Sequence, residues 1–107
     1  MEIRRYAMVV AALLISAATA HAETYTVIQA GKIFNTKLTT IKLGDSIEFV
    51  NQDKYSHNVY TRTKGHEFDL KVQSPGSSNF VTFDEPGKIK VRCAIHPRMK
   101  LTLYVIE

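Results

Sequence analysis

The sequence has a single cysteine among its 107 residues, so no disulfide bond can form within the chain. In an oxidising compartment, a lone cysteine pairs with another chain, lies buried, or serves as a metal ligand. A small domain buries only about 60 to 65% of its unfolded surface, so a bound metal would add useful stability. The surroundings of Cys93 are therefore the first place to look for chemistry.

The sequence also lacks an apolar run long enough to cross a membrane. The run from Ala7 to Ala20 is shorter than the roughly 20 residues that a spanning helix needs. It follows the basic pair Arg4-Arg5 and precedes Ala20-His21-Ala22, which matches a small-x-small cleavage site. We therefore predict a signal peptide at residues 1–22 and a periplasmic or secreted domain at residues 23–107, without stable membrane insertion.

The excess of positive charge is small. The chain has 14 Lys and Arg residues against 10 Asp and Glu residues, a net charge of +4. The basic residues are scattered and no module combining aromatic and basic residues is present, which argues against a nucleic-acid partner. A mildly basic protein is instead steered toward acidic partners, with an association that depends on salt.

No segment has the periodicity of a strong amphipathic helix. From Glu23 onward, apolar and β-branched residues occur in short runs separated by turn signals, a pattern typical of an all-β sandwich or barrel. The predicted strands cover Thr24 to Gln29, Leu38 to Leu43, Ser46 to Asn51, His57 to Tyr60, Asn79 to Phe83, Lys88 to Cys93 and Lys100 to Ile106. Residues 61–78 are predicted to form a loop with a short irregular element at Phe68 to Val72. About seven short strands in two sheets suit a single β-sandwich domain.

The segment that ends at Cys93 alternates strictly between basic and apolar residues. Cys93 shares one side of this predicted strand with Ile89 and Val91, while Lys88, Lys90 and Arg92 share the other. The cysteine side chain is therefore predicted to point into the core.

The string Cys93-Ala94-Ile95-His96-Pro97-Arg98-Met99 is a CxxHxxM pattern between two predicted strands. Thiolate and thioether favour Cu(I), imidazole suits both oxidation states, and copper heads the divalent affinity series. At this composition, a cysteine has His at +3 and Met at +6 by chance about once in a thousand cases. His57, at the start of a strand, can complete a trigonal His₂Cys set with a weak axial Met. We predict one copper ion, Cu(I) or Cu(II), bound by His57, Cys93, His96 and Met99.

The segment Ser56-His57-Asn58-Val59 followed by this loop resembles the plastocyanin and azurin family of cupredoxins, and the short loop is most similar to that of amicyanin. The segments Ile41 to Asn51 and Phe83 to Lys88 resemble the strand-turn-strand segments of that family. The resemblance implies a Greek-key β-sandwich with a type 1 (blue) copper centre at one end, which shuttles single electrons between periplasmic redox partners. It also implies that His57, Cys93 and His96 are equatorial ligands and that Met99 is axial.

Two loop residues depart from the family pattern. Ala94 stands where relatives often have a hydroxyl that bonds to the Asn beside the first His, so Asn58 is expected to hold the loop through backbone groups alone. Arg98 stands where relatives have an apolar residue, and together with Lys100 it would make the docking patch basic. We therefore expect redox partners with an acidic docking surface. We also expect the protein to be a monomer.

Several other functions compete with that of an electron carrier. Four protein ligands leave no open position for a substrate, which argues against an enzyme. A nucleophilic Cys-His enzyme is disfavoured because His96 would compete for the sulfur and no third, orienting group is evident. A copper-delivery protein of the same fold and a sandwich that binds no metal stay open. His66 is expected to be a solvated surface residue, with a second, weaker metal site as its alternative.

Overall fold

The computed structural model describes residues 21–107, so residues 1–20 of the predicted signal peptide lie outside the described residues. The described part of the chain forms nine β-strands and no helix. They are β1 (Thr24–Ala30), β2 (Ile33–Phe34), β3 (Leu38–Lys42), β4 (Ser46–Asn51), β5 (His57–Thr61), β6 (Phe68–Gln73), β7 (Ser78–Thr82), β8 (Gly87–Cys93) and β9 (Lys100–Ile106). Between residues 21 and 107 there is accordingly no apolar helix of membrane-spanning length.

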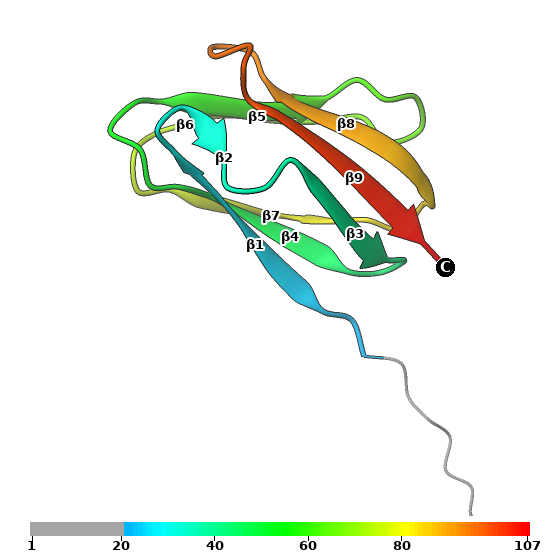
Figure 1. Ribbon diagram of the computed structural model, residues 1–107. Coiled ribbons are helices and arrows are strands. Elements are labelled where there is room, and N and C mark those ends of the chain that lie inside the picture. Colours follow the sequence, from blue (N-terminus) through cyan, green and yellow to red (C-terminus); the bar gives the residue numbers. More distant parts are fainter. Residues whose placement is uncertain (1–20) are drawn as a thin grey trace, which may run out of the picture.

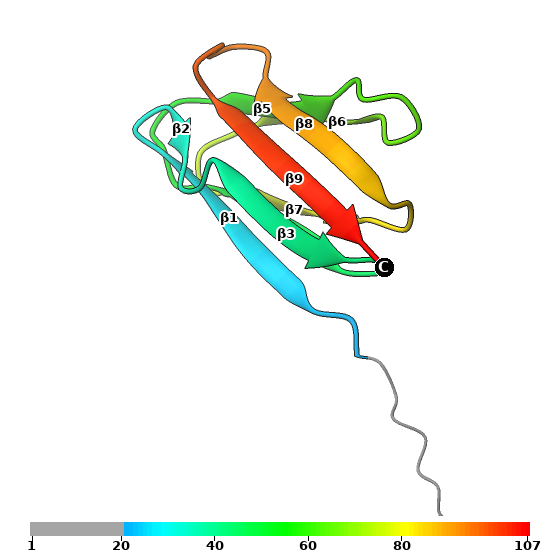
Figure 2. The same cartoon turned by 45° about the vertical axis from the view of Figure 1, so that its right-hand side comes forward.

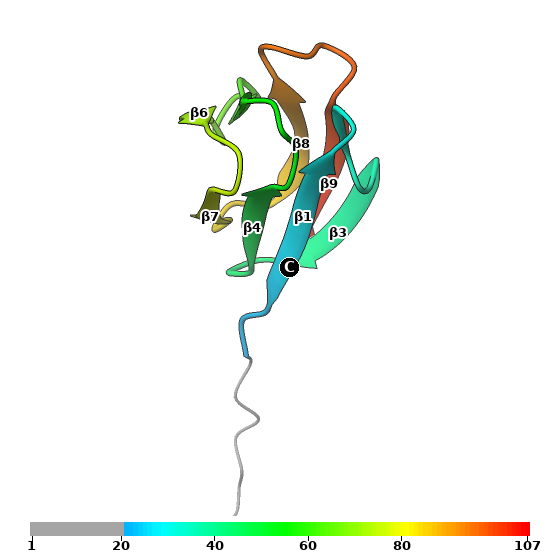
Figure 3. The ribbon, with the colours of Figure 1, turned by 90° about the vertical axis from the view of Figure 1, so that its left-hand side faces the viewer.

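The strands form two sheets that pack face to face (Figures 1 and 2). One sheet has the order β2-β1-β4-β7 and the other β3-β9-β8-β5-β6. The pairs β1 with β4 and β3 with β9 are parallel, and the other strand pairs are antiparallel. Figure 3 shows β6 above β7 at one side of the sandwich, where each is the edge strand of its sheet. The prediction of an all-β, two-sheet sandwich is confirmed.

The core fills the space between the inner faces of the two sheets. Strands β4, β8 and β9 alternate between buried and more exposed residues, as strands with one face on a core do. The buried apolar residues are Val27, Phe34, Ile41, Ile47, Phe49, Val59, Phe83, Ile89, Val91, Cys93, Met99, Leu101, Leu103 and Val105. The side chain of Cys93 points inward and is 3% exposed, which confirms the prediction from alternation.

The prediction of a loop over residues 61–78 is wrong. Strand β5 extends to Thr61, and β6 (Phe68–Gln73) pairs with it along its length. The pairing contains a register shift between Asn58 and Tyr60, and Lys71 has a φ of 61°. An irregularity of this kind breaks the two-residue alternation that marks a strand in a sequence. Phe68 and Leu70 nevertheless pack against the core, which explains why the segment becomes a strand.

Candidate metal centre

The four predicted ligand residues lie at one end of the sandwich. Cys93 ends β8, His57 begins β5, and the loop between β8 and β9 contains His96 and Met99; this loop stands at the top of Figure 1. The antiparallel register pairs Val59 with Cys93. Because residues two apart on a strand share a face, His57 is directed to the same side as Cys93. Strand pairing therefore brings together two residues that are far apart in the sequence.

Three donor atoms converge at this end. The Nδ1 atom of His57 lies 3.9 Å from the Sγ atom of Cys93 and 3.0 Å from the Nδ1 atom of His96. All three donor atoms lie within 4.8 Å of one another. Donors around one ion, with metal–nitrogen distances near 2.0 Å and metal–sulfur distances near 2.3 Å, stand about 3.3 to 3.7 Å apart. The distances in the structure, from 3.0 to 4.8 Å, bracket this range, and one sulfur with two imidazole nitrogens is a donor set that suits copper.

A carboxylate fixes the orientation and tautomer of His57. The Nε2 atom of His57 lies 2.8 Å from Oδ2 of Asp53. An ionised carboxylate only accepts hydrogen bonds, so Nε2 carries the proton and Nδ1 keeps its lone pair. That lone pair faces Cys93 and His96. This is the arrangement in which a carboxylate behind a histidine prepares the opposite ring nitrogen for a metal.

Asp53 is itself held by the turn between β1 and β2. Its carboxylate accepts hydrogen bonds from the backbone amides of Gly31, at 3.2 Å, and Lys32, at 2.8 Å. Burial on its own would raise the pKa of Asp53, but the Lys32 amide and the His57 ring together hold it below its ordinary value. Asp53 was not predicted from the sequence; its only signal is an acidic residue four positions before the predicted histidine ligand.

A buried amide shapes the loop that carries Asp53. The side-chain nitrogen of Asn51 donates to the backbone oxygens of Tyr55 and Gln73, each at 2.9 Å. Its side-chain oxygen accepts from the backbone amide of Asp53, also at 2.9 Å. Asn51 thereby ties the loop between β4 and β5 to β6 in the opposite sheet, and this fixes the approach to His57.

The sulfur of Cys93 receives one backbone hydrogen bond. The amide of Asn58 lies 3.3 Å from Sγ, and the carbonyl oxygen of Asn58 accepts from the Ala94 amide at 3.3 Å. The side chain of Asn58 turns the other way, to the Asp69 carboxylate at 2.7 Å and the Lys71 carbonyl at 3.0 Å. Asn58 therefore holds the ligand loop through backbone groups, as the alanine at position 94 led us to expect.

His96 and Met99 differ in exposure. Met99 is fully buried directly before β9, and its amide donates to the His96 carbonyl at 2.9 Å, which closes the loop. His96 is partly exposed and lies edge-on to Tyr55, with ring centroids 6.3 Å apart. Burial lowers the pKa of His96, and the neighbouring His57 ring and the positive charge of Lys32 lower it further. Both effects favour the neutral imidazole, the form that binds a metal.

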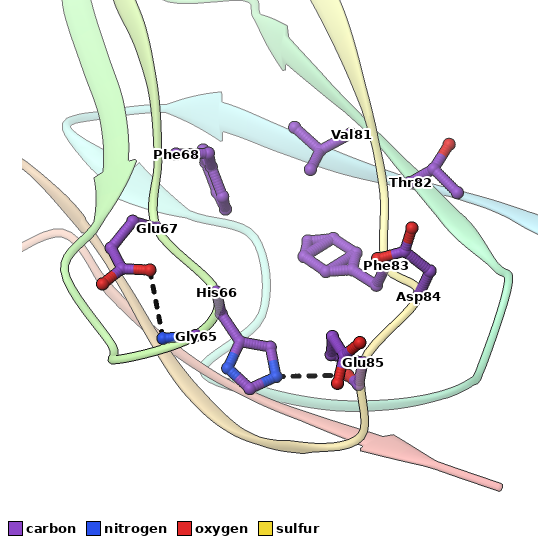
Figure 4. A pocket seen from close by; sticks show the side chains of 9 residues that line it. All are labelled: Gly65, His66, Glu67, Phe68, Val81, Thr82, Phe83, Asp84 and Glu85. Carbon is purple, nitrogen blue, oxygen red and sulfur yellow. Dashed lines mark hydrogen bonds between the residues drawn. The ribbon is translucent and has the colours of Figure 1, made fainter.

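His66 lies apart from this centre, near the start of β8. Figure 4 shows its ring against the segment that contains Glu85. The Nε2 atom lies 3.1 Å from the Glu85 carbonyl and 3.2 Å from the Pro86 carbonyl, and Nδ1 lies 3.2 Å from the Lys64 carbonyl. Within residues 21–107, the one group of three metal-binding side chains is His57, Cys93 and His96. His66 thus braces two loops through backbone contacts and belongs to no such group among the described residues.

Comparison of the sequence with known proteins gives two results. Residues 22–106 match the profile of the copper binding proteins of the plastocyanin/azurin family. A stretch of 61 residues is 38% identical to the methylamine utilization protein MauL of Methylorubrum extorquens; it covers 56% of this chain and about half, 54%, of that protein.

Many solved structures are similar to the sandwich, and two of them are copper proteins of different kinds. A mutant of amicyanin in its Cu(I) form superposes with a TM-score of 0.70 and 22% identity over 77% of this chain and 81% of the other; this likeness shows the fold alone. The copper-containing nitrite reductase of Thermus scotoductus has a TM-score of 0.74 and 27% identity over 89% of this chain but only 25% of the enzyme.

Proposed function

Because this chain belongs to the plastocyanin/azurin family of copper-binding proteins, we propose that it is a type 1 copper protein that shuttles single electrons between redox partners. Its cofactor is copper. The proposal rests above all on one observation, the convergence of a cysteine sulfur and two imidazole nitrogens within 4.8 Å at the end of a rigid sandwich.

We assign His57, Cys93 and His96 as equatorial ligands and Met99 as the axial ligand. Copper supplies the one-electron couple, and the chain supplies a fixed set of donors. His57 is held by Asp53, and Cys93 ends a paired strand with an amide bonded to its sulfur. Donors held in this way keep nearly the same arrangement in both oxidation states, so little reorganisation opposes electron exchange.

Electron exchange is assigned to the face where His96 reaches the surface. His57, Cys93 and Met99 are each at most 3% exposed, whereas His96 is partly exposed. His96 borders a surface cavity of about 160 Å³, together with Lys32 and Arg98. Positive charge beside the exposed ligand favours redox partners with an acidic docking surface.

The remaining parts of the proposal concern cellular context. Residues 1–22 are proposed to be a signal peptide, and the carrier is proposed to work in the periplasm as a monomer. We propose a carrier rather than an enzyme because four protein ligands leave no open coordination position. A copper-delivery protein of the same fold is the alternative, and the two differ in whether Cu(I) is retained.

The test is a titration of the purified protein with Cu(II). We expect one equivalent to produce the intense visible band of a copper–thiolate bond, and the Cys93→Ser variant to stay colourless. A reversible one-electron couple, with Cu(I) retained against a competing Cu(I) chelator, supports a carrier. Ready loss of Cu(I) to the chelator supports delivery, and a colourless native protein refutes the type 1 assignment.

A further inference from the structure

The outer face of the five-stranded sheet concentrates positive charge. Strand alternation directs the side chains of Lys88, Lys90 and Arg92 away from the core, and those of Lys42 and Lys100 on the neighbouring strands point the same way. Eight of the chain's 14 lysine and arginine residues lie on or beside this surface, which we call the basic face: Lys37, Lys42, Arg62, Lys88, Lys90, Arg92, Arg98 and Lys100.

Strand register makes these residues contiguous. Arg92 on β8 stands opposite Lys100 on β9, and Lys90 stands opposite Thr102. A depression of about 310 Å³ is lined by Tyr60, Arg62, Thr63, Lys90 and Arg92. A second depression, of about 490 Å³, is lined by Lys37, Arg98, Lys100 and Thr102. The Arg92 and Lys100 pair joins the two depressions into one surface.

No lysine or arginine of the basic face makes an ion pair with another described residue. Between residues 21 and 107, the one contact of a carboxylate with a basic side chain at ion-pair distance is that of Asp53 with the His57 ring. Arg62 lies over the Tyr60 ring at 5.0 Å and has acidic neighbours, since it shares a depression with Glu67 and Asp69. Like charges directly opposite on paired strands destabilise a sheet, so the Arg92 and Lys100 pair opposes folding. Negative charge on a bound partner would relieve this repulsion between the basic side chains.

The basic face also borders the proposed copper centre. Arg92 directly precedes Cys93, and Lys100 directly follows Met99, so two of its central residues are covalently joined to two proposed ligands. By contrast, the outward positions of β1, β4 and β7 contain no lysine or arginine and include Glu48. The molecule is therefore electrically polarised across the sandwich, and this polarity orients an approaching charged partner.

We propose that the basic face docks the acidic surface of a redox partner protein, alongside the exposed edge of His96. This inference rests on the proposed function. A protein is a better match than a lipid surface, because threonine and tyrosine hydroxyls line the depressions among the basic groups. The exposed apolar side chains of β3 and β9, Leu38 and Ile106, lie at opposite ends of these strands and so form no continuous apolar patch that could enter a bilayer.

The test uses a peptide of ten glutamates as the acidic probe and the ¹⁵N-labelled, Cu(I)-loaded protein. At low salt, we expect amide shifts centred on β8 and β9 that disappear at about 0.15 M salt. The double variant Lys88→Gln/Lys90→Gln should bind about five- to tenfold more weakly. The matched variant Lys54→Gln/Lys64→Gln loses the same charge outside the basic face and away from His96, and it should change binding less than about twofold.

The proposal is overturned if the two double variants weaken binding equally, since net charge alone would then explain it. Shifts confined to Lys32 and His96, with none on β8 and β9, would also overturn it, as would binding to phosphatidylglycerol vesicles without binding to the peptide. None of these readouts uses electron transfer. If the native protein fails to bind the peptide but still shows the copper–thiolate band when loaded with Cu(II), the docking face is refuted and the proposed function stands.

Discussion

Replacing Asp53 with asparagine is expected to weaken copper binding while the sandwich still folds. The Asp53 carboxylate accepts hydrogen bonds from Nε2 of His57 and from the amides of Gly31 and Lys32. An asparagine has only one oxygen, so its NH₂ group must face at least one of these donors. If it faces His57, the proton of that ring is driven to Nδ1, the atom that faces Cys93.

The size of the effect follows from the bond that is lost. A hydrogen bond to a charged group contributes about 1.5 to 3 kcal/mol, which corresponds to roughly ten- to 150-fold in binding. Loss of such a partner behind a metal-bound histidine typically costs about 10- to 100-fold in metal affinity. We therefore expect the copper affinity of Asp53→Asn to fall by one to two orders of magnitude, measured by competition with a chelator.

Asp45 provides a matched control in the turn between β3 and β4. It is 2% exposed, and its carboxylate accepts from the backbone amides of Glu23 and Lys42, each at 2.8 Å. Asp45→Asn should lower the free energy of unfolding but leave copper affinity unchanged. If Asp53→Asn binds copper within twofold of the native protein, or if both variants lose affinity alike, the argument from the His57 tautomer is refuted.

Four further outcomes are expected. The pKa of Asp53 lies below 3.8 in the folded protein, so the ionised carboxylate stabilises the fold above about pH 4, and this stabilisation is lost as the pH falls through the folded pKa. In urea unfolding, the difference in unfolding free energy between the native protein and Asp53→Asn should therefore narrow at low pH. A difference that does not change with pH would contradict this prediction. Gly87 has a φ of 148°, and a Cβ atom there would lie 2.9 Å from Cε1 of His66. Gly87→Ala should therefore lower the free energy of unfolding by about 1 to 3 kcal/mol, and adding His66→Ala should restore part of that loss. An unchanged urea midpoint in Gly87→Ala would contradict this prediction. Because Met99 is fully buried, Met99→Leu, which conserves volume, should lower the free energy of unfolding by less than about 1.5 kcal/mol, and Met99→Ala by about 2 to 5 kcal/mol. Both variants should change the visible spectrum of the copper-loaded protein if the Met99 thioether is the axial ligand. The positive charge of Arg98 favours the reduced, less positive copper centre, so Arg98→Phe should lower the midpoint potential and weaken the salt dependence of electron exchange. If neither changes, Arg98 does not influence the site electrostatically.

Local pattern was enough to predict much of the sandwich and of the candidate centre. Alternation in the strand before Cys93 correctly predicted an inward sulfur, because β8 is regular and one of its faces packs on the core. The spacing of Cys93, His96 and Met99 is a property of one short loop and needs no tertiary information. His57 could be proposed from chemistry, but its place beside Cys93 depends on the register of β5 with β8.

The features that were missed depend on contacts between distant segments. Asp53 looks like an ordinary loop acid until the Gly31 and Lys32 amides reach it from the turn between β1 and β2. Strand β6 (Phe68–Gln73) was hidden because the register shift opposite β5 disturbs its alternation. Neither a hydrogen bond from a remote turn nor a bulge leaves a recognisable pattern in a single sequence.

The pairing of β5 with β8 joins segments that are separated by some thirty residues of chain, and the parallel partners β3 and β9 are further apart still. Topologies dominated by such remote contacts fold slowly, typically over milliseconds to seconds, because chain entropy is lost before the contacts form. In the unfolded chain, His57 is remote from the other three proposed donors. The complete donor set therefore exists only after the sheets have assembled, so that tight metal capture reports the completion of folding.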